Sequence, residues 1–103
     1  MLQGLHWLSK LDLSFNRLEQ LGNYIFEDLT NLLELDLSDN FINKIRDNTF
    51  NGLRSLRILN LNHNRLTTIK ASQISWMRAL EHLMIEDNDL ETVVQGTFDS
   101  VRY

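Results

Sequence analysis

The chain has no cysteine and no proline among its 103 residues. Without cysteine there can be no disulfide, no zinc–thiolate site and no thiol nucleophile. No run of about 18 apolar residues is present, so we expect no transmembrane segment and no membrane contact by this chain. Residues 1–9 lack the basic and apolar regions of a signal peptide, and Asn-x-Ser/Thr glycosylation sites are also absent.

A positive charge excess is missing as well. Ten Lys and Arg residues stand against 14 Asp and Glu residues, which gives a net charge of −4. A nucleic-acid-binding domain usually presents a clustered basic face, so we expect no nucleic-acid partner. The 43% apolar and 23% charged residues are ordinary for a globular chain.

What the sequence does contain is a repeat. The segment Leu32–Asn40 alternates apolar and polar residues around Leu35 and Leu37, which predicts a short half-buried strand, and its asparagine suits a turn. The same arrangement recurs three more times, and its asparagines lie 24 residues apart without insertion: Asn16, Asn40, Asn64 and Asn88. A period between about 20 and 50 residues indicates a solenoid or an array.

Alignment of the repeats predicts one array over residues 1–103. Its four units are residues 8–31, 32–55, 56–79 and 80–103, and residues 1–7 match the end of a preceding unit. Seven apolar columns run through the units, and we expect them to form a shared core between stacked coils. A bulky column holds Phe26, Phe50, Ile74 and Phe98. Because Ile74 interrupts the phenylalanines and Trp76 follows it, the third coil should deviate locally.

The asparagine column is predicted to be structural. Each side chain should point into its coil and bond backbone groups that would otherwise be buried unpaired, which avoids roughly 1–3 kcal/mol per group.

The unit resembles that of the leucine-rich repeat family, Leu-x-x-Leu-x-Leu-x-x-Asn-x-Leu. The 24-residue length and the late phenylalanine are similar to the family's typical subclass, which is found in Toll-related receptors, adhesion molecules and matrix proteoglycans of animals. The resemblance implies an α/β solenoid: a right-handed coil with a short parallel sheet on its concave face. It also implies an extracellular or cell-surface location. Extracellular members usually end in cysteine-bearing caps, which this chain lacks, so we interpret it as a piece of a longer array or an artificially bounded segment.

Residues that alternate with the inward leucines should face the concave side. The informative ones are apolar where water is expected, namely Phe15, Phe41, Ile58 and Met84, and clustered apolar groups of this kind mark partner sites. His63 and His82 belong to the same candidate surface, and Glu86, Asp87 and Asp89 form an acidic rim that would steer a basic partner. The alternative is that the basic third unit and the acidic fourth unit simply attract each other.

Catalysis is not favoured. His63 and Asp87 share a column on neighbouring coils and should be able to pair, but no serine or cysteine follows as a nucleophile. His82 lies roughly 16 Å along the strand from the His63 column, too far for a shared metal. The residues around Asn88 lack the glycine and distal glutamate of a calcium loop. Trp7 and Trp76 are interpreted as partial covers of the coil, and Trp76 is the better candidate for a lateral contact.

The sequence therefore predicts a non-catalytic module that binds a protein ligand on its concave face, with no cofactor and no metal. The implied setting is an extracellular receptor or adhesion ectodomain. The alternative is a structural spacer whose exposed repeat ends stack on each other and form a homo-oligomer. Light scattering separates the two.

Overall fold

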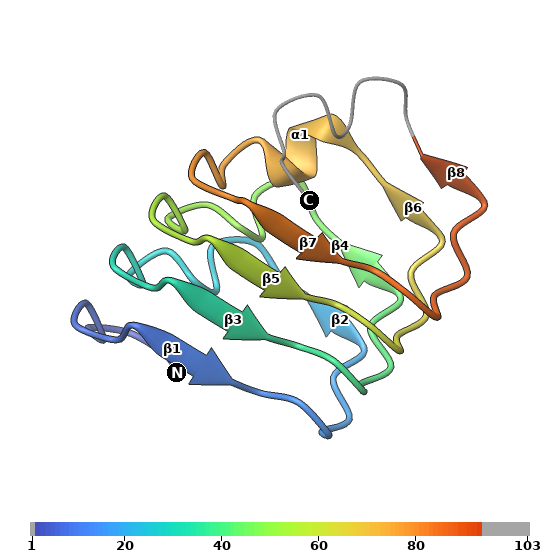
Figure 1. Cartoon of the computed structure of the whole chain (residues 1–103), viewed down its shortest axis with the longest axis horizontal. Coiled ribbons are helices and arrows are strands. Elements are labelled where there is room, and N and C mark those ends of the chain that lie inside the picture. Colours follow the sequence, from blue (N-terminus) through green and yellow to red (C-terminus); the bar gives the residue numbers. More distant parts are fainter. Residues whose placement is uncertain (1, 94–103) are drawn as a thin grey trace.

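The protein is a solenoid of stacked coils, as expected from the repeat. Its structure, a computed structural model, describes residues 2–93. The central feature is a four-stranded parallel sheet in the order β1-β3-β5-β7, with one strand from each coil (Figure 1). These strands are β1 (Lys10–Asp12), β3 (Glu34–Asp36), β5 (Ile58–Asn60) and β7 (His82–Met84).

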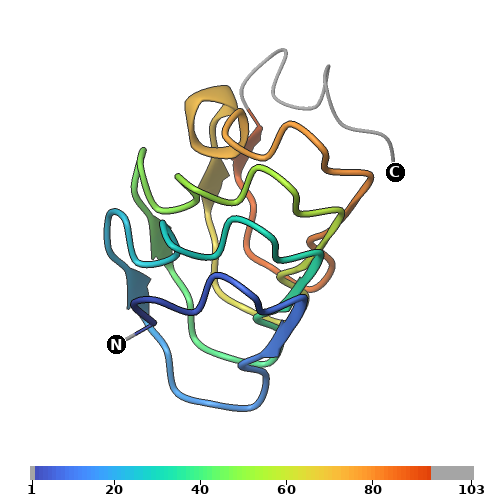
Figure 2. The same cartoon turned by 90° about the vertical axis from the view of Figure 1, so that its left-hand side faces the viewer.

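The opposite side of each coil carries a shorter strand. β2 (Gln20–Leu21) pairs with β4 (Lys44–Ile45), and β6 (Thr68–Ile69) pairs with β8 (Thr92–Val93), all in parallel. Figure 2, turned by 90°, shows the main sheet and these short pairs on opposite sides of the stacked coils. The only helix among the described residues is α1 (Ala71–Ile74), one turn in the third coil. That helix is the deviation predicted for this coil.

Equal coil length sets the register of the main sheet. Each strand residue pairs with the residue 24 positions later, so that Leu11, Leu35, Leu59 and Leu83 form one row. Backbone bonds continue beyond the strands: the Leu37 N–H donates to the Asn60 carbonyl at 2.8 Å, and the Asp39 N–H donates to Asn62 at 3.0 Å. The coils are therefore joined by backbone hydrogen bonds along most of this side.

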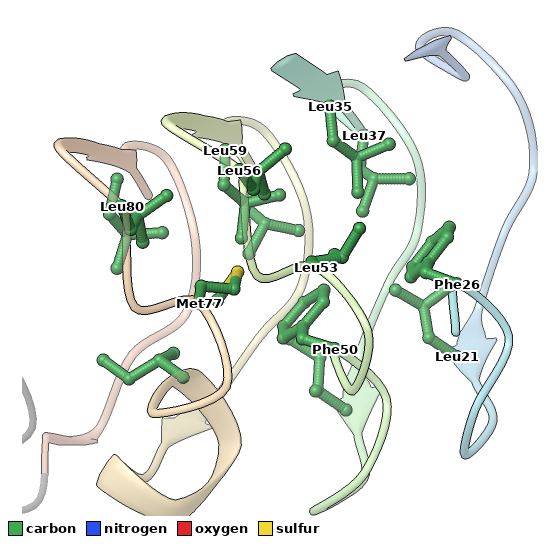
Figure 3. Close-up of a cluster of buried hydrophobic side chains, with 14 of the residues drawn as sticks. Leu21, Phe26, Leu35, Leu37, Phe50, Leu53, Leu56, Leu59, Met77 and Leu80 are labelled. Atoms are coloured by element: carbon green, nitrogen blue, oxygen red, sulfur yellow. The ribbon is translucent and has the colours of Figure 1, made fainter. Parts of the chain in front are cut away.

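The interior between the two lines of strands is filled with aliphatic and aromatic side chains (Figure 3). Phe26 and Phe50 stack with ring centroids 6.3 Å apart and an interplanar angle of 7°. Ile74 continues their column and is buried. Phe98, with the rest of the predicted unit after residue 93, lies outside the described residues. Most of this burial occurs between coils, which is why repeated leucines specify the fold.

Asn40 shows how a turn inside the core is satisfied. Its side-chain amide donates to the carbonyls of Leu37 and Ser38 in its own coil and of Leu13 in the preceding coil, each at 3.1 Å. Its Oδ1 accepts the Leu18 N–H, also at 3.1 Å. One buried side chain thus pairs four backbone groups in two coils.

The other asparagines take the same position. Asn64 and Asn88 each donate to three carbonyls and accept one N–H from the preceding coil. Asn16, in the first coil, donates only to Leu13 and Ser14 and is exposed.

A second polar link crosses the coils on the convex side. The Thr49 hydroxyl donates to the Leu21 carbonyl at 3.0 Å, and 24 residues later the Gln73 amide donates to the Ile45 carbonyl at 2.8 Å. Each side-chain oxygen also accepts a backbone N–H from three residues earlier in the chain. Threonine and glutamine therefore make equivalent hydrogen bonds at equivalent positions of two coils. The sequence pattern did not predict this equivalence.

Candidate functional site

The concave face of the main sheet carries two rows of outward side chains. The first row is Asp12, Asp36, Asn60 and Met84, and the second is Lys10, Glu34, Ile58 and His82. Most of these residues line a shallow hollow of about 400 Å³ on the sheet. Since each row lies across the strands, a partner bridging the coils would contact all four repeats.

The aspartates of this face also hold the turns that follow the strands. Asp12 Oδ1 accepts the Ser14 N–H at 2.9 Å and the Ser14 hydroxyl at 2.5 Å, and Asp36 does the same for Ser38. The hydrogen bond from the Ser14 hydroxyl is the largest cause of a lowered pKa of the Asp12 carboxyl, and the hydrogen bond from the Ser14 backbone N–H also lowers it. The structure therefore gives these surface residues a role in the turn that their residue types alone did not indicate.

The fourth coil satisfies its turn differently. Met84 stands where the other coils have an aspartate or asparagine, and it has no oxygen to accept the Glu86 N–H. That N–H donates instead to Asn62 Oδ1 of the preceding coil, at 2.7 Å. Asn62 in turn donates its own N–H to Asn60 Oδ1 at 3.0 Å. The apolar Met84 is therefore tolerated on the concave face because Asn62 replaces the serine found in the first two coils.

The column of Asn16, Asn40, Asn64 and Asn88 is called the asparagine ladder below. The residue before each of these asparagines adopts a left-handed backbone. Phe15, Asp39, His63 and Asp87 all have φ between 55° and 57°. This conformation is uncommon for residues other than glycine, and it directs these four side chains outward at the rim that follows the strands. Phe15 is 80% exposed there.

His63 and Asp87 are neighbours on this rim. His63 Nδ1 lies 3.0 Å from Asp87 Oδ2, which confirms the predicted pairing, and both side chains are exposed. No serine hydroxyl is bonded to His63 within the described residues, and no cluster of three or more His, Asp or Glu side chains capable of holding a metal occurs among them. The pair is therefore a bridge between adjacent turns.

Phe41 lies one position beyond the asparagine, in the next column. The Arg65 guanidinium sits 4.7 Å from its ring centroid, so this aromatic ring already has a cation–π partner in the following coil. Neither Phe15 nor Phe41 lines the concave hollow, whereas Ile58 and Met84 do. The four apolar candidates were expected to form one cluster, but they divide between the sheet and the rim, because Phe15 and Phe41 come after the ends of β1 and β3, where the chain has left the sheet.

Opposite charges on the third and fourth coils partly neutralise each other. Arg57 Nε lies 2.8 Å from Glu81 Oε2, and this hydrogen bond raises the Arg57 pKa. With Asp87 beside His63, the exposed side chains of Glu86 and Asp89 remain as the acidic rim. His82 is exposed at the far end of the second concave row.

The two tryptophans differ. The Trp76 indole N–H donates to the Asp47 carbonyl of the preceding coil at 2.7 Å, so Trp76 partly covers the coil as expected. It also lines a second hollow with Arg54 and Arg78. Trp7, in contrast, is 72% exposed, so most of its side chain does not cover the coil as predicted.

Comparisons with known proteins agree with this architecture. The leucine rich repeat family model matches residues 7–66 and 54–102. No curated protein sequence matches the chain. Across the part of the chain that the structure describes, no helix is long and apolar enough to cross a membrane.

Two solved structures are similar. One is the TLR13–ssRNA13 complex, with 33% sequence identity and a TM-score of 0.79 over 82% of this chain. The other is the Toll–Spatzle complex of Drosophila, with 25% identity and a TM-score of 0.84 over 97% of this chain. The chain spans only 12% and 15% of those two proteins. TLR13 is in complex with single-stranded RNA in that structure, and Toll is in complex with the protein Spatzle.

Proposed function

Because the chain belongs to the leucine-rich repeat family, we propose that it is a non-catalytic segment of a receptor-type ectodomain that binds a protein ligand on its concave face. The observation that carries this proposal is the placement of Ile58 and Met84. Both are apolar, both lie in the concave hollow, and neither belongs to the core. An apolar group kept on an open sheet gains most when a partner covers it.

The setting is part of the proposal. Both similar structures are Toll-related proteins in complex with a ligand, and one of those ligands, Spatzle, is named with Toll as a hub in development and innate immunity. We place this chain by analogy in an extracellular or cell-surface protein with a receptor or adhesion role. The rim residues Phe15, Phe41, His63, Asp87 and the acidic pair Glu86 and Asp89 would form the border of the contact.

The test is affinity capture from extracellular medium with the chain immobilised, followed by quantitative mass spectrometry. Three double variants are compared with the unaltered chain: Ile58→Ser/Met84→Ser on the sheet, Phe15→Ser/Phe41→Ser on the rim, and Ile25→Ser/Leu33→Ser as a control. Ile25 and Leu33 are exposed and lie outside the concave hollow. Each variant must give the same circular dichroism spectrum as the unaltered chain.

We expect a protein captured by the unaltered chain and by the control, and lost with the sheet variant. Loss only with the rim variant would move the contact to the rim, and equal capture by all variants would refute the concave site. Ribonuclease treatment of a parallel sample identifies any capture that depends on RNA.

A second function, a spacer that self-associates, is favoured by one feature. The first coil exposes an apolar hollow of about 520 Å³ that is lined by Leu2, Leu13, Leu18 and neighbouring residues. If copies stack through this end, sedimentation velocity will show a concentration-dependent dimer, and Leu13→Gln/Leu18→Gln will abolish it. A dimer with a Kd on the order of micromolar would form at about 100 μM. A protein that stays monomeric up to that concentration would therefore reject this function.

A further inference from the structure

The concave face is chemically asymmetric. In the first row, the sequence from β1 to β7 is acid, acid, amide, thioether, from Asp12 through Asp36 and Asn60 to Met84. In the second row, Lys10 lies 3.6 Å from Glu34, and Ile58 follows. The half of the hollow formed by the first two strands is therefore charged, and the other half is uncharged and apolar.

The charged half has a net negative charge. Lys10 and Glu34 offset each other, which leaves Asp12 and Asp36 in register on adjacent strands, about 4.8 Å apart between backbones. Each uses only Oδ1 for its turn, and within residues 2–93 no hydrogen bond or ion pair involves either Oδ2. The lowered pKa of Asp12 keeps that carboxyl ionised at neutral pH. Two adjacent carboxylates repel each other, and a cation placed between them relieves this repulsion.

The uncharged half offers a surface for an apolar group. Ile58 and Met84 are diagonal neighbours on β5 and β7, and both are half-buried within the hollow. Asn60, between Asp36 and Met84, already uses its Oδ1 in a turn. Met84 lies two strand spacings from Asp36, which is about 10 Å. In an extended peptide, side chains two residues apart face the same side and lie about 7 Å apart, so a peptide with one side chain at Asp36 places the next one on that face between Ile58 and Met84.

We propose that the concave hollow docks an extended protein segment with a cationic side chain at Asp12 and Asp36 and an apolar side chain two residues away at Ile58 and Met84. This inference rests on the proposed protein-binding function and names the chemistry of its partner. It also gives a physical reason to favour protein over nucleic acid at this face, because a phosphate backbone would meet two carboxylates instead of a basic surface.

The structure supplies a conservative variant. In β5, Asn60 holds its turn through the same Oδ1 contact that Asp12 and Asp36 make. Asp12→Asn/Asp36→Asn therefore removes both charges while keeping an acceptor for each turn. Glu19→Gln/Glu27→Gln removes two charges from exposed residues outside the hollow and controls for net charge.

The probe is a phage-displayed library of linear 12-residue peptides, selected on the full chain at low salt. We expect enriched peptides to carry Arg or Lys two residues from Leu, Ile or Phe. Synthetic copies should bind Asp12→Asn/Asp36→Asn about tenfold more weakly, as loss of two charge-assisted contacts implies. They should bind the Glu19→Gln/Glu27→Gln control unchanged, and binding should weaken with added salt.

Three results would overturn the inference. Peptides that require Ile58 and Met84 but bind the Asp12→Asn/Asp36→Asn variant equally would refute the cationic contact and leave concave-face binding intact. Peptides that are indifferent to both pairs would refute the concave site as well. Finally, a single-stranded oligouridylate that binds the unaltered chain and loses affinity with Ile58→Ser/Met84→Ser would show that the face accepts RNA.

Discussion

Asn40 and Asn43 have the same side chain three residues apart, but only Asn40 is buried and only its side chain is hydrogen-bonded. We expect Asn40→Ala to lower the free energy of unfolding by about 2–4 kcal/mol, because several backbone groups lose their partner inside the core. Asn43→Ala should change it by less than about 0.5 kcal/mol. Urea unfolding followed by circular dichroism measures both, and equal midpoints would contradict the structural role of the ladder.

Gly52 is a second residue whose identity is set by space. Its φ is +101°, and a Cβ at this position would lie 2.4 Å from the Glu27 carbonyl oxygen of the preceding coil. Gly52→Ala should therefore destabilise the protein by roughly 1–3 kcal/mol or more, since both the backbone conformation and the coil spacing must change. Gly22→Ala is the control, because only Ile25 Cγ2 lies near its Cβ, at 3.7 Å. A thermal melt in which both variants match the parent would rule out this close contact.

The left-handed backbone conformation in the turns after the main strands could not be predicted from the sequence. Phe15, Asp39, His63 and Asp87 share one backbone conformation but no side-chain chemistry. The asparagine that follows each of them was identified because it recurs unchanged. The left-handed positions do not stand out in the same way, because the turn imposes one conformation on residues of different types.

The stability of the turn after β1 should depend on pH through the Asp12 carboxyl. The folded pKa of Asp12 is lower than its unfolded value, so the turn is favoured when Asp12 is ionised. The stabilisation is present above the unfolded pKa of about 3.9 and is lost as the pH falls through the lower folded pKa. NMR titration of the Asp12 carboxyl should give a midpoint below that of a short peptide.

Asp12→Asn provides the matching control. The variant keeps an acceptor for Ser14 but cannot titrate, so it should lose less stability than the parent as the pH falls below the unfolded value of about 3.9 and through the lower folded pKa of Asp12. Parallel losses in both proteins would show that Ser14 does not stabilise the Asp12 carboxylate.

The third coil shows which features of an element were foreseeable. Replacement of phenylalanine by Ile74 predicted a local deviation, and α1 is found there. The helical turn itself was not predicted, nor was the bond from Gln73 to the Ile45 carbonyl. Both depend on how the chain between two strands reaches the preceding coil, and the repeat pattern specifies the strands more strictly than these connections.

For the whole molecule, stability should be graded along the stack. Among the described residues, β3 and β5 are paired on both sides, whereas β1 is paired only with β3, and four leucines of the first coil are only partly buried: Leu8, Leu11, Leu13 and Leu18. Because each coil is stabilised by its neighbours, the terminal coil opens with the lowest free energy. Hydrogen exchange should be slowest at the Leu37 and Leu61 amides and faster at Leu13, although all three are hydrogen-bonded. Uniform protection would indicate a single cooperative unit.

At this scale the sequence was most informative. The period of 24 defined the register, the order of the strands and the composition of the core, because a solenoid repeats one local solution. The candidate site was less predictable. Ile58 and Met84 were correctly placed on the concave face, but Phe15 and Phe41 were separated from them, since a turn of three or four residues redirects side chains that are close in sequence.

Asn62 of the third coil accepts the hydrogen bond from the Glu86 N–H of the fourth coil, and this restricts how such a chain can evolve. The third coil carries the acceptor that the fourth one lacks, so the two are adapted to each other and not interchangeable units. Duplication of the fourth coil would put Glu86 in the position of Asn62, and the Glu86 carboxylate is one methylene farther from the backbone than the Asn62 oxygen that accepts this bond. Exchange of repeats within this array is therefore restricted between the third and fourth coils, and these two coils should stay adjacent in evolution.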